Sequence, residues 1–176
     1  MVELLDKYRE LYLLSKEASD KEIERIRRIE DKSAKLISLC ALLIAFVGFA
    51  GKFVLDSFIP PHILYDWLCF ISYSSFAAII IYAFFNLLGT LKVINIYINP
   101  SNQEMITFFD HNSYIDVLYA LAKNNNEAIA FNSMEYKKKL KKLKCSYWAI
   151  YCSMVFMVVF IISLVLGMYI KSKLGG

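Results

Sequence analysis

Residues whose types and spacing could do chemistry are few in this chain. It has two histidines, His62 and His111, and its six glycines form no loop that could cradle a phosphate. Asp110 and His111 lie close to Asp116, a combination that could in principle transfer protons. A polar face on an amphipathic helix explains the same three residues, and we prefer that interpretation. We therefore expect no enzyme, no catalytic residue and no cofactor.

The cysteines give no sign of a metal site. Cys40, Cys69, Cys145 and Cys152 lie in or beside apolar stretches, form no CxxC pair and have no histidine at ligand spacing. We expect reduced thiols rather than a zinc site or a disulfide framework.

The charged residues avoid three long stretches, and these set the fold class. The chain is 58% hydrophobic and 20% charged, too apolar for a typical soluble domain of 176 residues. About 20 apolar residues cross a bilayer as a helix, and this predicts transmembrane helices at 36–55, 67–91 and 145–170. The first stretch is free of charge over 36–51 and reaches spanning length by continuing past Lys52, whose long side chain can extend to the outer interface. We predict an all-α integral membrane protein whose three transmembrane helices are continuous with long cytoplasmic helices.

Lysine and arginine indicate the orientation, because they are retained on the cytoplasmic side. Nine of the 20 lie before the first apolar stretch and eight lie within 92–144. We therefore expect residues 1–35, including the N-terminus, and 92–144 in the cytoplasm, with the hairpin 56–66 and the C-terminal tail 171–176 outside. The expected location is a membrane.

The cytoplasmic segments are predicted to be helical. Residues 2–34 lack Gly and Pro, and Leu4, Tyr8, Leu11 and Ser15 follow helical spacing before a restart near Ser19 or Asp20. A second cytoplasmic helix is expected over 104–123, interrupted by the three asparagines 124–126. Residues 93–98 suit either a short strand or the last turns of a helix, and we favour helix.

The segment before the third apolar stretch has the clearest periodicity. Apolar and small residues step by four and three, which predicts a seam between helices of one bundle or of an oligomer; its members are Ile129, Ser133, Tyr136, Leu140, Leu143 and Tyr147. Lysines fill the other faces, and those expected to meet lipid headgroups are Lys137, Lys138, Lys141, Lys142 and Lys144. The same lysines could simply hold the third span inward, and the two roles are compatible. We expect no nucleic-acid binding, because acids balance bases in the N-terminal segment.

Small residues predict where helices approach closely within the membrane. Ala41, Ala45 and Gly48 share one face of the first span, and Ser163 and Gly167 lie four residues apart in the third. Contacts within one chain and contacts between subunits both fit this pattern. No Asp, Glu, Lys or Arg lies centrally in any span, which disfavours an ion-coupled transporter.

A charged element leads directly into the first span. Asp31, Lys32 and Lys35 form an acid-Lys-x-Ala-Lys sequence in which Asp31 and Lys35 are i,i+4 partners on a helix. This element, the tight hairpin and the late Lys-rich helix together resemble small bacterial membrane effectors of anti-phage defence, of the SLATT and Pycsar-effector type. The resemblance covers most of the chain and rests on residues 29–39 and 118–146.

The resemblance implies a location in a bacterial inner (plasma) membrane and a function. Such effectors stay inactive until a nucleotide second messenger or a separately encoded sensor protein signals infection; they then assemble, disrupt the inner membrane and arrest or kill the cell. We expect a homo-oligomer that contacts membrane lipids, and this chain departs from the family pattern in having no separate nucleotide-binding domain. The alternative is a non-enzymatic membrane scaffold that tethers a cytoplasmic partner.

Overall fold

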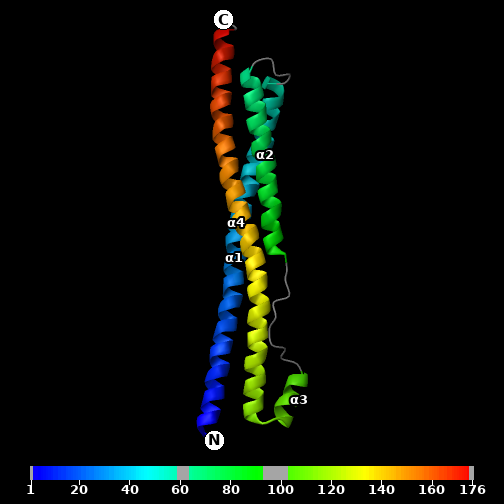
Figure 1. Ribbon diagram of the computed structural model, residues 1–176. Coiled ribbons are helices and arrows are strands. Elements are labelled where there is room, and N and C mark those ends of the chain that lie inside the picture. Colours follow the sequence, from blue (N-terminus) through cyan, green and yellow to red (C-terminus); the bar gives the residue numbers. More distant parts are fainter. Residues whose placement is uncertain (1, 59–63, 93–102, 175–176) are drawn as a thin grey trace. The chain divides into compact units, whose positions relative to one another are not determined.

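The computed structural model describes residues 2–58, 64–92 and 103–174. They form four helices, α1 (Val2–Phe58), α2 (Leu64–Leu91), α3 (Gln103–His111) and α4 (Tyr114–Leu174), and contain no strand (Figure 1). The all-α prediction is confirmed for this part of the chain. The alternatives for 93–98 lie outside the described residues.

Three of the helices are long and apolar enough to cross a membrane. The segments concerned are Glu3–Val54 in α1, Leu64–Leu91 in α2 and Tyr114–Ile170 in α4. These helices contain the three apolar stretches predicted from the sequence. In α1 and α4 the apolar stretch continues a charged helix without a break.

Two predicted interruptions are wrong, because α1 runs through Ser19 and Asp20 and α4 runs through the three asparagines. Ser19 and Asn125 are buried, and the Asn125 amide donates to Ser15 Oγ at 3.1 Å. Such side chains favour caps and turns only when no better partner is present. Tertiary packing therefore keeps these positions helical.

The helix predicted over 104–123 is divided instead. α3 ends at His111, and α4 starts at Tyr114 behind an N-cap, Ser113, whose hydroxyl accepts the Asp116 backbone N–H at 3.3 Å and donates to the Asp116 carboxylate at 2.6 Å. The Ser-x-x-Asp spacing is a helix-start signal that could have located this boundary. Asp116 thus has a structural role in the described fold, next to the helix start.

The inner face of α1 follows one repeat along most of its length. Positions that alternate by three and four residues are all buried or half-buried, as expected for a coiled-coil seam; they are Leu5, Tyr8, Tyr12, Ser15, Ser19, Glu22, Ile26, Ile29, Ser33, Leu36, Cys40, Leu43, Val47, Ala50 and Val54. Burial in α1 therefore follows one repeat through both its charged part and its apolar part.

The chain divides into two compact units. The charged unit comprises Met1–Glu30 and Val93–Leu140, and the apolar unit comprises Asp31–Lys92 and Lys141–Gly176. In the charged unit, α1 and α4 run parallel: the rings of Tyr8 and Tyr119 lie 6.1 Å apart, and Ser15 bonds Asn125. Residue numbers rise together along both helices, so the pairing has a single register.

In the apolar unit, α2 runs antiparallel to α1 and α4. The Tyr73 hydroxyl donates to the Val47 carbonyl of α1 at 2.9 Å, and its ring lies 5.5 Å from that of Phe160 in α4. A buried cluster forms around this point from Ala50, Val54, Cys69 and Phe160, with Phe46, Phe70, Tyr73 and Leu164 packed against it. Tyr73 thus connects all three long helices.

Candidate functional site

The seam of the charged unit is unusually polar. Ser15, Ser19, Asn125, Asn132 and Lys139 are buried there among the apolar residues. The Lys139 ammonium donates to the Glu30 carboxylate across the two helices. Polar residues at seam positions fix register and partner choice at a cost in stability. The pairing of α1 with α4 is therefore specific but weakly driven by hydrophobic burial.

Ion pairs cover the exposed side of α1 in this unit. Lys21 lies 2.6 Å from Glu17, and Arg28 lies 2.7 Å from Glu24, each pair spaced i,i+4. The hydrogen bond from Lys21, and then its charge, lower the pKa of the Glu17 carboxyl below its usual value. Exposed pairs of this kind support the helix only slightly.

The seam predicted for α4 lies beside the buried stripe of the single chain. Leu143 is buried, Ile129, Ser133, Tyr136 and Leu140 are half-buried, and Tyr147 is exposed. The buried positions include Ala128, Asn132, Lys139, Ser146 and Ile150, one residue away at most steps. Much of the buried stripe within the single chain is polar, so apolar residue type alone does not trace it. A contact between subunits through Tyr136, Leu140 and Tyr147 stays a prediction.

The lysine cluster divides into two groups. Lys138 pairs with Glu135 at 2.5 Å, Lys139 is buried against Glu30, and Lys142 Nζ donates to the Gly89 carbonyl at 3.3 Å near the C-terminal end of α2. A lysine at a helix C-terminus meets the carbonyls that lack intrahelical partners. Lys137, Lys141 and Lys144 are exposed and have no hydrogen bond or ion pair within the described part of the chain.

Aromatic residues follow these lysines on α4. Tyr147, Trp148 and Tyr151 line a shallow hollow of about 360 Å³, and the rings of Trp148 and Tyr151 are T-shaped with centroids 6.1 Å apart. Trp148 is 71% exposed. Lys141, Lys144, Trp148 and Tyr151 lie at i, i+3, i+7 and i+10, so they share one side of the helix. We call these four residues the basic-aromatic face.

The two predicted small-residue faces differ in burial. Ser163 and Gly167 of α4 are buried inside the apolar unit, whereas Ala41, Ala45 and Gly48 of α1 are exposed. A Cβ added at Gly48 would have no neighbour within 4 Å. The α4 face is therefore used within one chain, and the α1 face is left open.

Gly51 is the small residue of α1 at the close approach to α2. A Cβ at Gly51 would lie 2.6 Å from Tyr73 Oη, closer than a Cβ atom approaches an oxygen to which it is not bonded. Gly51 lies outside the small-residue face predicted from the sequence, which contains Ala41, Ala45 and Gly48. The 3-4 repeat that leads to Ala50 and Val54 was the signal that could have indicated the packed side.

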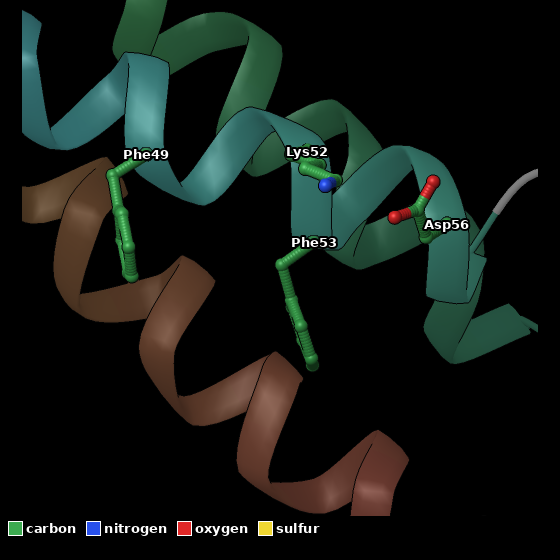
Figure 2. Close-up of a pocket in the computed structure, with 4 residues that line it drawn as sticks. All are labelled: Phe49, Lys52, Phe53 and Asp56. Atoms are coloured by element: carbon green, nitrogen blue, oxygen red, sulfur yellow. The ribbon is translucent and has the colours of Figure 1, made fainter.

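The charged residues around the first span are exposed. Asp31, Lys32 and Lys35 all face outward, and the described residues include no salt bridge between Asp31 and Lys35. At the other end of the apolar stretch, Phe49, Lys52, Phe53 and Asp56 line a hollow of about 480 Å³. Figure 2 shows Phe49 and Phe53 extending from α1 on the side of α4, yet Phe49 remains 84% exposed.

No protein-family model, curated protein or solved structure matches the chain. Within the described residues, no group of three or more His, Cys, Asp or Glu side chains could hold a metal ion.

Proposed function

We propose that this chain is a membrane effector of a bacterial anti-phage defence system, which oligomerises and permeabilises the inner membrane when triggered. One observation carries the proposal: α1 and α4 each extend without a break from a charged helix into a stretch apolar enough to cross a membrane. A rearrangement among the charged helices can thus be transmitted along two continuous helices. The N-terminus is cytoplasmic and the C-terminus external in this proposal.

The polar seam supports a state that can be switched. Serine, asparagine and lysine side chains occupy positions that leucine would fill in a maximally stable coiled coil. A partner that offers better contacts needs to overcome only a modest pairing energy. We propose that a separately encoded sensor protein or a nucleotide second messenger supplies these contacts.

The open face of α1 supports assembly. Three helices cannot enclose an aqueous channel alone, so a lesion requires several chains. In lipid, small residues let backbones approach and replace the missing hydrophobic drive. Ala41, Ala45 and Gly48 are exposed in the single chain and supply such a face.

The test is membrane potential in bacteria that express the full-length chain, with oligomer size measured on detergent extracts by mass photometry. We expect depolarisation with a large particle once the chain is activated. Leu140→Pro, which breaks α4, should abolish depolarisation, and Leu140→Ala is the matched control that keeps the helix. Charge reversal at Lys35 should do the same, with Lys16→Glu as its control. Full depolarisation by both Leu140→Pro and Lys35→Glu would refute the mechanism.

A scaffold that tethers a cytoplasmic partner is the second candidate, favoured by apolar side chains on the charged unit. Leu11 and Leu14 of α1 and Phe108 and Phe109 of α3 are exposed. Lipid cannot cover them if the charged unit lies in water, and such patches mark contacts with proteins. A scaffold would retain its partner in a pull-down and leave dye inside liposomes, whereas an activated effector would release it.

A further inference from the structure

We propose that the basic-aromatic face of α4 binds the phosphate of an anionic phospholipid in the inner leaflet. The inference rests on the membrane location proposed above and assigns a ligand to one surface of it. The four residues of the face belong to the apolar unit and to one uninterrupted helix. Their relative positions are therefore set by helix geometry alone.

The choice of lysines comes from their contacts. Lys142, on another side of the helix, is engaged by the Gly89 carbonyl. Lys141 and Lys144 are exposed and have no such partner among the described residues. Two ammonium groups one turn apart, both with free donors, suit a phosphate oxygen cluster.

The aromatic hollow extends the site toward the apolar part of a ligand. Tyr147, Trp148 and Tyr151 present ring surface beside the lysines, and Tyr151 is 63% exposed. Amphipathic rings of this kind concentrate at the headgroup level of bilayers. The hollow suits the glycerol ester region of a lipid whose phosphate lies on Lys141 and Lys144.

The same side of α4 continues as an apolar ridge. Val155, Val158, Ile162 and Val165 are exposed and follow Tyr151 at helical spacing, and the exposed Tyr169 closes the ridge. Trp148 and Tyr169 are about 30 Å apart along a helix that rises about 1.5 Å per residue, which matches the hydrocarbon core. A phospholipid can use the lysines, the rings and the ridge together, whereas a soluble phosphate compound can use only the lysines.

The test uses Trp148 as a reporter in the full-length chain carrying Trp67→Phe, reconstituted in vesicles. Phosphatidylglycerol or phosphatidylcholine with brominated acyl chains is included at equal mole fraction. We expect stronger quenching of Trp148 by the anionic lipid. The double variant with Lys141→Gln and Lys144→Gln should lower the preference of the face for the anionic over the zwitterionic lipid about tenfold or more. Each lysine near the surface adds to the attraction for anionic lipid. Lys7→Gln with Lys16→Gln, which removes the same charge from the charged unit, should leave it unchanged.

Equal quenching by both lipids would overturn the proposal, and so would an equal effect of the two lysine pairs. Loss of the lipid preference on addition of soluble glycerol phosphate would also overturn it, because that result would identify a soluble phosphate ligand instead. The converse protein, with Trp148→Phe and Trp67 as reporter, separates failure of the lipid site from failure of the membrane location. Quenching of Trp67 with no lipid preference at Trp148 would refute the site alone. Absence of quenching at both tryptophans would refute the membrane location as well.

Discussion

The Lys139 ammonium donates to the Glu30 carboxylate across the α1–α4 pair, although the two residues are 109 positions apart in the chain. The two partners are unequally buried, with the lysine side chain 3% exposed and the glutamate side chain 34% exposed. Water therefore reaches the carboxylate far more easily than it reaches the ammonium. The pair constrains the register of the two helices more than it contributes net stability.

Glu30→Gln should accordingly be more harmful than Lys139→Met. Replacing the carboxylate by a neutral amide removes the negative charge that faces a buried ammonium, and it should lower the free energy of unfolding by about 2–3 kcal/mol, somewhat less than for a fully buried pair. Lys139→Met leaves a carboxylate that can be hydrated and should cost less than about 1 kcal/mol. Thermal unfolding of the detergent-solubilised chain, followed by helical circular dichroism, measures both. Equal losses in the two variants would contradict the asymmetry.

Sequence periodicity predicts the helices of this chain well but not the side that each buries. The apolar stretches identify three long helices because composition alone distinguishes them. In α4 the predicted seam shares Leu143 with the buried stripe, but Asn132, Lys139 and Ser146 also occupy that stripe and the more apolar Tyr147 is exposed. A polar residue enters a seam when it finds a partner there, and that partner lies far away in the sequence.

The candidate lipid site shows the same division between local and tertiary information. The sequence identifies the run of lysines, because a run is a local property. It does not show that Lys142 caps α2 or that Lys139 is buried against Glu30. The distinction between engaged and available lysines depends on contacts between helices. Those contacts leave Lys137, Lys141 and Lys144 available, and of these three Lys141 and Lys144 belong to the apolar unit, as do Trp148 and Tyr151.

Gly51→Ala should destabilise the apolar unit. The added methyl would lie 2.6 Å from Tyr73 Oη. Tyr73 cannot easily move away, because its ring packs against Phe160 and its hydroxyl donates to the Val47 carbonyl. We expect a loss of about 1–3 kcal/mol, typical of overpacking. Gly48→Ala is the matched control, because its methyl meets open space, and it should be neutral or slightly stabilising.

A double variant tests the cause of that loss. Tyr73→Phe alone should cost about 1 kcal/mol through the lost hydrogen bond to Val47. In the Gly51→Ala background it removes the clashing oxygen, so it should recover stability. Additive losses in a thermal-unfolding cycle would show that the contact between Gly51 and Tyr73 does not determine the packing.

Ser33→Ala should stabilise the chain or leave it unchanged. Ser33 is fully buried, and its hydroxyl has no hydrogen-bond partner among the described residues. No hydrogen bond therefore offsets the free-energy cost of removing this hydroxyl from water. Ser153 is equally buried but donates to the Ile150 carbonyl at 2.7 Å. Ser153→Ala should therefore gain less than Ser33→Ala, by about 1 kcal/mol in unfolding free energy. The reverse order would indicate that Ser33 bonds a partner when the chain is assembled.

Ala45→Leu should reduce assembly without unfolding the single chain. Ala45 lies between Ala41 and Gly48 on the exposed face of α1. At Gly48, an added Cβ would have no neighbour within 4 Å in its own chain. If subunits pack there, the added bulk separates their backbones and weakens a contact that depends on close approach. Ala78→Leu on the exposed side of α2 is the control for added volume in lipid. We expect a smaller particle by mass photometry and loss of depolarisation for Ala45→Leu only, with unchanged helical content in both variants. Particles of wild-type size in both would exclude the small-residue face of α1 from the subunit contact.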